Sequence, residues 1–328
     1  MKKYVMLDSQ ALAGADFGVE KKILGEAGIE CVIGECKTAA QMESLASDAD
    51  AVGLCYVDMN GKLMDSLKKC KVLVRYGIGY DTINVPDATQ RGIAVCNLPD
   101  YCQPDVATHA FAMILDCCRK ITLQDRLMRG GRYETTYGYR IHRLSTLKMG
   151  FAGFGAIAKT LARYMKPYEM DMLAFDPYLP AEVFAQNAVR QVTFDELLAQ
   201  ADIVSIHSPY TPETHHLFNK DSFAKMKNGV IIVNTARGPI ICLDDLAAAL
   251  KSGKVAAAGL DTVEGEPNVP PDHPIFSCES AIFTPHCAFN SAEAELEQHQ
   301  KVAKSVIEVL GGNLPYNCVN KKQLQKQQ

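Results

Sequence analysis

Short apolar runs alternate with helix-patterned stretches through the first hundred residues of the chain. The apolar runs are short enough to be buried strands, and they cover residues 4–8, 30–35, 51–56, 71–76 and 92–97. Between them, apolar residues recur at helical spacing near residues 18–27, 38–47, 60–69 and 84–91. Alternation at this pace predicts a parallel sheet with helices on both faces.

The middle of the chain departs from this pattern. Two prolines, Pro99 and Pro104, precede a long, mostly apolar helical pattern over residues 105–131 that ends at Gly130 and Gly131. Residues 132–148 are polar and aromatic without a clear period. We interpret this segment as a connecting arm that contacts another subunit.

A second alternation starts at residue 149. Its predicted strands are residues 149–154, 171–176, 202–207, 229–236, 255–261 and 281–286. Its predicted helices lie near residues 155–165, 180–187, 194–200, 219–226 and 243–251. A last helical pattern covers residues 292–310, and we interpret the short basic tail after residue 320 as a frayed end. The pattern predicts an α/β protein with two Rossmann-like, doubly wound parallel-sheet domains.

One stretch, residues 148–176, has the sequence of a dinucleotide-binding unit. A dinucleotide fold requires Gly-x-Gly-x-x-Gly or Ala between a strand and a helix, with an acidic residue about 20 positions later. Gly153, Gly155 and Ala158 occupy the three small positions, and Asp176 supplies the acid. We therefore predict that NAD binds the turn formed by Gly153, Phe154, Gly155, Ala156, Ile157 and Ala158.

Asp176 also indicates which nicotinamide cofactor is used. Its carboxylate would accept hydrogen bonds from ribose hydroxyls and repel a 2′-phosphate, and no cation follows in Pro177, Tyr178 or Leu179. This favours NAD over NADP. Taken alone, Asp176 could equally be a loop aspartate before proline, and the glycine turn alone would be a weak signal.

Composition narrows the class of protein. The chain has 328 residues, 48% hydrophobic residues and a net charge of −4, and no basic stripe that would bind nucleic acid or an anionic membrane. No apolar run approaches the length of a membrane span, and charge appears too early for a secretory signal, so we expect a cytoplasmic protein. Its 12 cysteines show no paired spacing, which indicates buried thiols without metal or disulfides.

Polar residues follow several predicted strands of the second cycle. Ligands of open parallel sheets bind at the carboxyl ends of the strands, so these residues should converge on one cleft. They are Asp176, His207, the turn from Thr235 to Gly238, the segment from Asp261 to Pro267, and the turn from Thr284 to His286.

Three of these residues fit the reduction of a 2-keto acid. Arg237 can hold a carboxylate and polarise a carbonyl because arginine is permanently charged and bidentate. His286 can exchange a proton near neutral pH, and Glu266 can orient its ring. Each alone could be structural: Arg237 a surface ion pair, Glu266 a solvated acid, His286 a buried histidine.

The other histidines suit catalysis less well. His215 and His216 are adjacent and therefore point in different directions. His207 ends a strand, lines the expected cofactor cleft and has no acid nearby in sequence. His109 lies within an apolar helical pattern, where a role in the core or in a subunit interface is the simpler interpretation.

Most of the chain resembles the D-isomer-specific 2-hydroxyacid dehydrogenase family. The matching segments are RYGIGYDTINV (75–85), GIAVCNLPDY (92–101), VATHA (106–110), GFAGFGAIA (150–158), HSPYTPETHHLFN (207–219), MKNGVIIVNTARGPI (226–240), AAGLDTVEGEP (257–267) and FTPHCAFNS (283–291). They look most similar to the branch that contains phosphoglycerate dehydrogenase-like enzymes and C-terminal-binding proteins. Glycine commonly occupies the position of Ala158 in this family.

The resemblance implies a domain arrangement and a set of functional residues. Residues 1–98 and 290–328 would form a flavodoxin-like substrate domain, interrupted by an NAD domain at 99–289, in a homodimer with residues 121–147 at its interface. Arg237 would bind and polarise the keto acid, and Glu266 would support His286 as proton donor. Further cofactor contacts would come from His207, Ser208, Pro209, Thr214, Thr235, Ala236, Asp261 and Ala288, and substrate contacts from Arg75, Tyr76, Gly77, Ile78, Gly79 and Phe289.

We thus expect an NAD-dependent oxidoreductase that interconverts a 2-keto acid and a D-2-hydroxy acid. Retention of Glu266 distinguishes the chain from formate dehydrogenases, which have glutamine there. Phe289 favours small or branched aliphatic keto acids. Two alternatives stay open: an NADH-gated, corepressor-like binding protein, which the complete catalytic trio disfavours, and a phosphoglycerate dehydrogenase, for which the sequence does not place Arg75 and Arg91 around a phosphate.

Overall fold

Two compact units make up the protein. The computed structural model describes residues 1–12, 14–133, 135 and 140–326. One unit comprises Met1–Tyr101 together with Ser291–Gln328, and the other comprises Cys102–Asn290. We refer to them as the first and second units. The substrate-binding and NAD-binding roles assigned to these parts of the chain stay predictions at this point.

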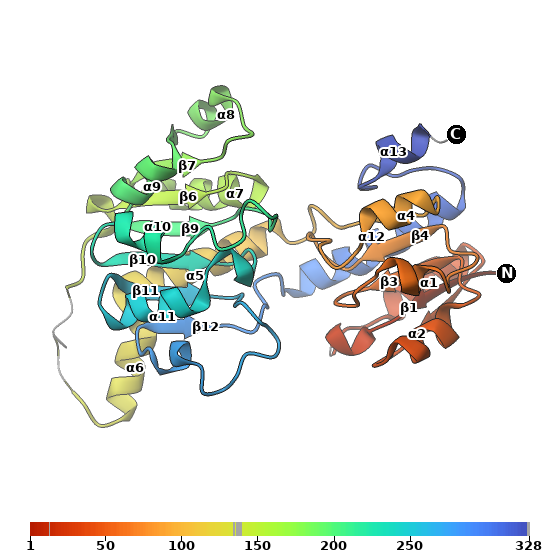
Figure 1. Ribbon diagram of the computed structural model, residues 1–328, viewed down its shortest axis with the longest axis horizontal. Coiled ribbons are helices and arrows are strands. Elements are labelled where there is room, and N and C mark those ends of the chain that lie inside the picture. The colour runs from red at the N-terminus through yellow and green to blue at the C-terminus, as the bar shows by residue number, and fades with distance from the viewer. Residues whose placement is uncertain (13, 134, 136–139, 327–328) are drawn as a thin grey trace. The chain divides into compact units, whose positions relative to one another are not determined.

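The first unit is built on a five-stranded parallel sheet with the order β2-β1-β3-β4-β5, which is the flavodoxin-like order (Figure 1). The strands are β1 (Lys2–Met6), β2 (Ile29–Ile33), β3 (Ala51–Leu54), β4 (Val72–Arg75) and β5 (Ala94–Cys96). The helices are α1 (Gly18–Glu26), α2 (Ala39–Ala46), α3 (Gly61–Met64), α4 (Val85–Gln90), α12 (Ala292–Leu310) and α13 (Lys321–Gln325).

Two of these helices differ from the sequence prediction. The pattern at 60–69 yields only the short α3, which Asn60 caps by accepting a hydrogen bond from Leu63 N. The tail interpreted as a frayed end forms α13, whose Leu324 is buried. Leu324 is the only buried residue within this short helix, and one buried apolar residue leaves no periodic signal in the sequence.

A buried polar network ties α12 to the start of the chain in the first unit. Glu20 on α1 accepts hydrogen bonds from the Tyr76 hydroxyl and from His299 Nδ1 on α12, the latter at 3.0 Å. The Tyr4 and Tyr76 hydroxyls are 2.7 Å apart. Glu20 and His299 are 0% and 1% exposed, so removing either would leave a buried polar atom of the other without its hydrogen-bond partner.

The second unit contains a seven-stranded parallel sheet with the order β12-β11-β10-β9-β6-β7-β8 (Figure 1). Its strands are β6 (Lys148–Ala152), β7 (Asp171–Phe175), β8 (Arg190–Gln191), β9 (Ile203–Ile206), β10 (Val230–Asn234), β11 (Val255–Leu260) and β12 (Ala281–Phe283). Counted from β6, this is the doubly wound 3-2-1-4-5-6 order with one strand added. The sequence predicted six strands and missed β8, because two exposed residues carry no apolar pattern.

Seven α-helices accompany this sheet in the described part of the second unit. They are α5 (Gln103–Arg119), α6 (Ile121–Arg129), α7 (Ala156–Met165), α8 (Ala181–Gln186), α9 (Phe194–Gln200), α10 (Lys220–Lys225) and α11 (Leu243–Lys251). Short 3-10 turns across the whole chain are η1 (Ser9–Leu12), η2 (Leu144–Thr146), η3 (Lys166–Tyr168), η4 (Gly238–Ile240) and η5 (Pro274–Ser277).

The single helix predicted at 105–131 is wrong, because α5 and α6 are separate. Lys120 between them has a φ of 57°, and Asp116 accepts a hydrogen bond from Thr122 N at 2.8 Å. One left-handed residue redirects the chain without breaking the apolar pattern. The arm predicted at 132–148 lies partly outside the described residues.

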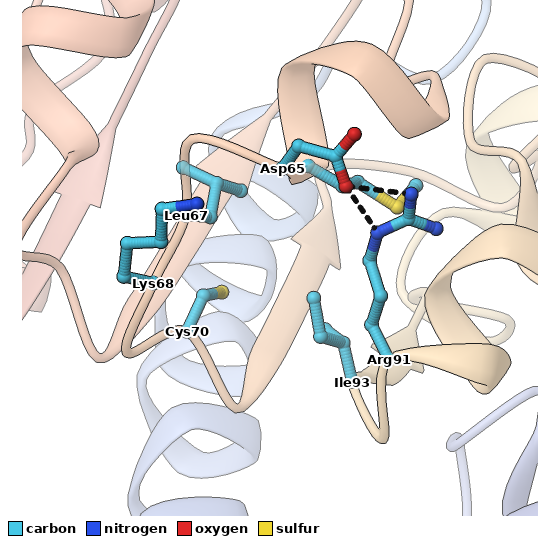
Figure 2. A pocket seen from close by; sticks show the side chains of 7 residues that line it. Asp65, Leu67, Lys68, Cys70, Arg91 and Ile93 are labelled. Carbon is cyan, nitrogen blue, oxygen red and sulfur yellow. Dashed lines mark hydrogen bonds and ion pairs between the residues drawn. The ribbon is translucent and has the colours of Figure 1, made fainter.

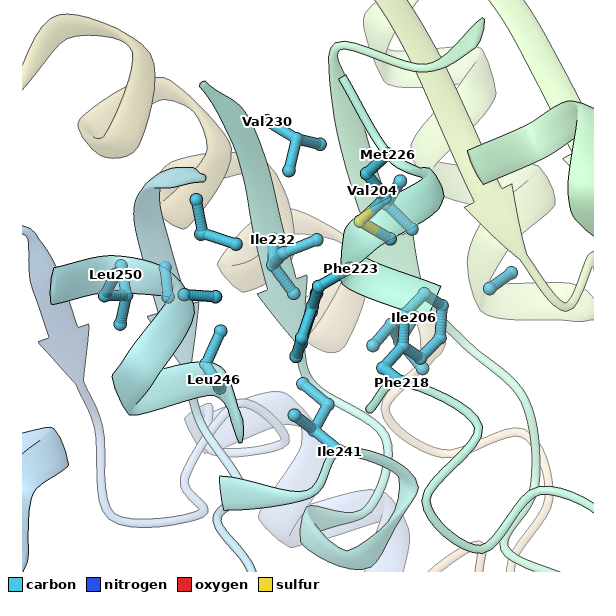
Figure 3. Packing of buried hydrophobic residues seen from close by; sticks show 14 of the residues in the cluster. Val204, Ile206, Phe218, Phe223, Met226, Val230, Ile232, Ile241, Leu246 and Leu250 are labelled. Carbon is cyan, nitrogen blue, oxygen red and sulfur yellow. The ribbon is translucent and has the colours of Figure 1, made fainter. Parts of the chain in front are cut away.

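Apolar side chains pack on both faces of the second sheet. Along β10, Val230 and Ile232 belong to one buried cluster, while Ile231 and Val233 belong to another, because side chains alternate across a strand. Figure 3 shows the first cluster, in which Phe223 of α10 and Leu246 of α11 lie among the strand residues. In the described residues, no helix combines the length and apolar character needed to cross a membrane.

Candidate active site

The carboxyl ends of the strands in the second unit bring the predicted polar residues to one edge of the sheet. All strand pairs in this sheet are parallel, so each strand ends at the same edge. Asp176 follows β7, His207 follows β9, Thr235 follows β10, Asp261 follows β11, and His286 comes after β12. The strand order reverses between β6 and β9, which is where doubly wound sheets bind their ligands.

The two glycines of the turn after β6 have different environments. Gly153 has a φ of 86°, and a Cβ there would lie 2.7 Å from the Ser208 backbone N. A Cβ at Gly155 would meet no atom within 4 Å. Gly153 is therefore required for the contact between neighbouring loops, while Gly155 leaves an open approach to the backbone. Ala158 is fully buried, as a close contact between helix and strand requires.

The start of α7 and Asp176 offer polar groups to a cofactor. Gly155 provides no side chain to cap α7, so the first-turn amides, which include those of Ala156 and Ile157, depend on an external acceptor. Asp176 accepts hydrogen bonds from Phe154 N at 2.9 Å and from Tyr178 N at 3.0 Å. Each carboxylate oxygen uses one lone pair in this way and keeps capacity for a ribose hydroxyl.

The loop after β9 is held by its own side chains. Ser208 Oγ donates to Ala152 O at 3.0 Å, and Thr214 Oγ1 donates to Pro209 O at 2.8 Å. His207 Nε2 lies 2.8 Å from Ser205 Oγ. Burial lowers the pKa of His207 to about 4, so its ring is neutral at physiological pH. A neutral ring at this edge adds no positive charge to the site.

The turn after β10 presents Arg237. Asn234 shapes it, because its Oδ1 accepts a hydrogen bond from Ala236 N and its Nδ2 donates to Arg237 O, each at 3.0 Å. Arg237 Nη1 donates to Ala236 O at 2.7 Å. The Thr235 hydroxyl is buried and has no hydrogen-bond partner among the described residues. A buried hydroxyl without a partner is costly, so this position suits a ligand that supplies one.

Gly238 locks this turn against the loop that carries Glu266. A Cβ at Gly238 would lie 2.1 Å from the Val263 carbonyl carbon and 2.4 Å from Glu264 N. These are backbone atoms, which have little freedom to move. The Arg237 turn and the 263–266 loop are thus placed relative to each other by a contact that only glycine permits.

His286 and Glu266 form a hydrogen-bonded pair. His286 Nδ1 lies 2.7 Å from Glu266 Oε1, and Glu266 Oε2 accepts a hydrogen bond from Val263 N at 3.0 Å. This contact assigns a proton to Nδ1, since the carboxylate is the acceptor, and it directs Nε2 to the opposite side of the ring. His286 has a φ of 53°, an unusual conformation for a side-chain-bearing residue that is typical of functional sites.

Asp261 organises the turn that carries His286. It is 2% exposed and accepts hydrogen bonds from Thr284 Oγ1 at 2.6 Å, Cys287 N at 2.9 Å and Ala288 N at 3.1 Å. The Asp261 carboxylate and the Ala288 N–H, both in residues predicted to contact the cofactor, are therefore engaged within the protein. Phe289, next in the chain, is half-buried.

His109, interpreted from the sequence as a core or interface residue, contacts the turn that precedes His286. Its Nε2 on α5 lies 2.9 Å from Thr284 Oγ1 and 3.7 Å from Asp261 Oδ1. The only sequence signal was the VATHA segment, because the helical pattern does not show which strand the ring faces. His109, Asp261 and Cys287 bring ligand atoms within 4.8 Å, but backbone N–H groups already occupy both Asp261 oxygens, and burial raises the pKa of the Cys287 thiol.

A second histidine–glutamate pair lies in the same region of the chain. His216 Nε2 is 2.5 Å from Glu264 Oε1, and Leu243 N donates to Glu264 Oε2 at 3.3 Å. His215 stacks on His216 with ring centroids 3.9 Å apart. Glu264 thus joins the loop before α10 to the start of α11, and this pair has a structural role.

The first unit carries the loop predicted to bind substrate, residues 75–79. Asn97 Nδ2 donates to Ile78 O at 2.6 Å, and Leu98 N donates to Gly77 O at 2.9 Å. Across the described residues, the backbone N–H groups of Ile78 and Gly79 have no hydrogen-bond acceptor. They fit an anionic ligand.

Arg75 and Tyr76 differ in what they offer at this loop. Arg75 is half-buried, and its guanidinium carbon lies 5.9 Å from the centre of the Tyr56 ring. The Tyr76 side chain is 3% exposed and belongs to the core network, so only its backbone can contact a substrate.

Arg91, considered with Arg75 as a phosphate ligand, lies at the other end of this sheet. It lines a pocket of about 270 Å³ together with Lys68, Cys70 and Ile93, which precede β4 and β5 (Figure 2). Its guanidinium donates two hydrogen bonds to Asp65 Oδ1, at 2.7 and 3.0 Å. Arg75 ends β4, so the two arginines are at opposite ends of the sheet and do not share a phosphate.

Comparisons with known proteins identify the family of the chain. Residues 111–288 match the family model described as D-isomer specific 2-hydroxyacid dehydrogenase, NAD binding domain. The chain is 33% identical over 327 residues to a hydroxypyruvate reductase of Blautia hydrogenotrophica, covering 97% of this chain and 100% of that protein. It is 37% identical over 290 residues to a D-3-phosphoglycerate dehydrogenase of Archaeoglobus fulgidus, covering 87% of this chain but only 55% of that protein.

A solved structure shares the fold over nearly the whole length. A glyoxylate reductase from Paecilomyes thermophila superposes with a TM-score of 0.85 at 27% sequence identity, covering 98% of this chain and 99% of that chain. The expected two-domain α/β fold is thereby confirmed. The chain belongs to the D-isomer specific 2-hydroxyacid dehydrogenase family.

Proposed function

We propose that this protein is an NAD-dependent dehydrogenase that interconverts a 2-keto acid and a D-2-hydroxy acid. The observation that carries the proposal is the 2.7 Å contact between His286 Nδ1 and Glu266, at the strand edge where Arg237 also lies. An arginine and a carboxylate-supported histidine supply the cation and the acid that keto-acid reduction requires. Family membership supports the same reaction class.

The residues of the second unit that would hold the cofactor are those at the carboxyl edge of its sheet. The first-turn amides of α7 and the open approach at Gly155 fit a pyrophosphate, and the Asp176 carboxylate fits the ribose hydroxyls. The unpartnered Thr235 hydroxyl offers a further donor or acceptor. When bound, the nicotinamide cofactor supplies or receives the hydride. Asp176 would repel a 2′-phosphate, which favours NAD over NADP.

The chain's own groups perform the remaining chemistry. Arg237 binds the keto acid and draws electron density towards its carbonyl oxygen. Protonated His286 then donates a proton from Nε2 to that oxygen, while Glu266 stabilises the charged ring through Nδ1. In the reverse direction the neutral ring accepts the proton. In the first unit, the backbone N–H groups of Ile78 and Gly79 have unused donors that fit a carboxylate.

Short 2-keto acids are the proposed substrate class. The relatives named hydroxypyruvate reductase and glyoxylate reductase act on small acids by their names, and both cover nearly all of this chain. The engagement of Arg91 with Asp65 speaks against a phosphate site formed with Arg75. Half-buried Phe289 supports an apolar wall for the side chain of the substrate.

A substrate panel tests the proposal. NADH oxidation is followed with glyoxylate, hydroxypyruvate, pyruvate, branched 2-keto acids and phosphohydroxypyruvate, using the wild type and His286→Gln. We expect the wild type to turn over at least one short acid. In His286→Gln we expect the turnover rate to fall by about 10³-fold and the NADH affinity to stay unchanged. Turnover by His286→Gln at the wild-type rate would refute the assignment.

We further propose a cytoplasmic homodimer. All 12 cysteines are free thiols, which suits a reducing compartment. On α6 and just beyond it, Ile121, Met128 and Tyr133 are 59%, 47% and 83% exposed, and such apolar exposure supports a subunit contact. Light scattering on the purified chain tests the dimer; a mass of 35.9 kDa in solution would contradict it.

A further inference from the structure

Two buried cysteines face each other across an antiparallel pair in the first unit. Cys96 ends β5, which is the edge strand of the sheet, and Cys318 lies in the segment between α12 and α13. The two residues form an isolated antiparallel bridge. This segment, residues 313–320, thus covers the edge of β5 although it is more than 200 positions away in sequence.

The backbone hydrogen bonds define the type of pair. Val319 N donates to Val95 O at 2.8 Å, and Asn97 N donates to Asn317 O at 3.3 Å. These bonds flank Cys96 and Cys318, so the two cysteines occupy a non-hydrogen-bonded position, where opposite Cα atoms are about 4.5 Å apart and side chains are closest. That separation lies within the range of about 4.4–6.8 Å found for disulfides. Cys318 Sγ donates a hydrogen bond to Asn320 Oδ1 at 3.4 Å, within the same pair of segments.

Neighbouring side chains fix this register. Asn320 Oδ1 accepts a hydrogen bond from Val95 N, and Asn320 Nδ2 donates to Ile93 O, both at 2.9 Å. Asn317 Nδ2 donates to Asn97 O at 2.6 Å and to Ser305 Oγ at 3.0 Å. The sulfurs are therefore held opposite each other by contacts that do not depend on them.

The two thiols are not equivalent. Cys318 is 6% exposed and Cys96 is 0% exposed, so a small reagent reaches Cys318 first. The adjacent Cys96 thiol lowers the pKa of Cys318, and the adjacent Cys318 sulfur raises the pKa of Cys96. Burial instead raises the pKa of other cysteines, such as Cys70, to about 12. The thiolate is the reactive form, which makes Cys318 the attacking group.

We propose that Cys96 and Cys318 form a peroxide-oxidised dithiol site whose disulfide ties the C-terminal segment to β5. The Cys318 thiolate attacks one peroxide oxygen, the O–O bond breaks and hydroxide leaves, giving a sulfenic acid. The Cys96 sulfur then attacks the Cys318 sulfur, the S–O bond breaks and a second hydroxide leaves. The two thiol protons convert both hydroxides to water. The cysteine pair loses two electrons, and the peroxide gains two.

The position of the pair gives its oxidation a structural consequence. Asn97, next to Cys96, donates to Ile78 O in the 75–79 loop and accepts a hydrogen bond from Asn317. A disulfide would fix the segment that holds Asn97. The closed loop between the two cysteines is long, so the disulfide should stabilise the folded chain by restricting the unfolded one.

The test uses the full chain and hydrogen peroxide. After treatment, remaining thiols are alkylated, and intact mass and a non-reduced peptide digest are measured. Compared with an untreated, alkylated control, we expect the treated chain to carry two alkyl groups fewer and to be about 2 Da lighter beyond that difference. We also expect a cross-linked peptide joining Cys96 to Cys318, reversal by dithiothreitol, and a Tm increase of roughly 5–10 °C. Cys318→Ser and Cys318→Ala should each abolish the cross-link and the Tm increase.

Cys102→Ser is the matched control. Cys102 is 1% exposed and lies in the same tryptic peptide as Cys96, so this variant should keep both the cross-link and the Tm increase. Fragmentation of the linked peptides identifies the joined cysteine. A cross-link through Cys102, oxidation of Cys318 to a sulfinic acid without a cross-link, or unmodified protein would each overturn the proposal. The readout is covalent, so its result is independent of the proposed dehydrogenase activity.

Discussion

Glu266→Gln isolates the contribution of the carboxylate beside His286. In the wild type, Glu266 Oε1 lies 2.7 Å from His286 Nδ1, and Oε2 accepts a hydrogen bond from Val263 N at 3.0 Å. Glutamine has the same shape but only one acceptor oxygen, so it cannot accept from both donors as the carboxylate does. It also lacks the charge that stabilises the protonated ring.

The expected size of the effect follows from this contact. A hydrogen bond to a charged group contributes about 1.5–3 kcal/mol, against about 1 kcal/mol for a neutral one. The two side chains are 22% and 29% exposed, so solvent partly screens the pair and the difference should be about 1.5 kcal/mol. This corresponds to about a tenfold loss in kcat/KM.

Glu264→Gln serves as the matched control for this experiment. Glu264 also pairs with a histidine, His216, and also accepts a backbone N–H, but it lies outside the proposed catalytic group. Steady-state kinetics with NADH and a short keto acid should show the loss in Glu266→Gln and less than about a twofold change in Glu264→Gln. Equal losses in both variants, or full activity in Glu266→Gln, would refute the reasoning.

Three further outcomes are expected. Gly238→Ala should lower Tm by roughly 5–10 °C because its Cβ would lie 2.1 Å from a backbone atom. Gly155→Ala should keep Tm and weaken NADH binding by about tenfold, as a titration of NADH fluorescence would detect. The opposite pattern would contradict the assignment of the turn. Asp176→Asn should raise NADPH efficiency relative to NADH by about tenfold, and an unchanged ratio would show that the charge does not select the cofactor. Burial lowers the pKa of His207 from 6.5 to about 4, so the unfolded chain binds the proton first and stability is lost as pH falls from about 6.5 to about 4. In denaturant unfolding over that pH range, the free energy of unfolding of His207→Gln should fall by about 3 kcal/mol less than that of the wild type. Equal pH dependence of the two free energies would contradict this.

Local signals were sufficient for the elements that define the fold. The apolar runs predicted five strands of the first sheet and six of the seven in the second, because a buried parallel strand is apolar on both faces. The glycine turn was recognisable because the tight turn restricts one position, Gly153, and the close approach of backbone restricts another, Gly155. In the structure a Cβ at Gly153 would meet backbone atoms, whereas a Cβ at Gly155 would meet no atom within 4 Å. Short or exposed elements such as β8 carried no such signal.

The candidate catalytic residues were predictable for a related reason. Arg237, Glu266 and His286 follow successive predicted strands, and strand ends of a parallel sheet share an edge. The sequence could not choose between the two histidine–glutamate pairs from charge alone. The contact of Glu266 with His286, and of Glu264 with His216, follows from how each loop packs.

The tertiary structure alone decided the contacts between segments far apart in the chain. It placed His109 beside Thr284, joined Glu20 to His299, set Cys96 opposite Cys318, and separated Arg91 from Arg75. Each depends on which faces and ends of elements meet, and periodicity describes a single element at a time. The sequence by itself predicted most of the elements, the glycine turn and the reactive residue types, whereas the packing of those elements determined which side chains lie together.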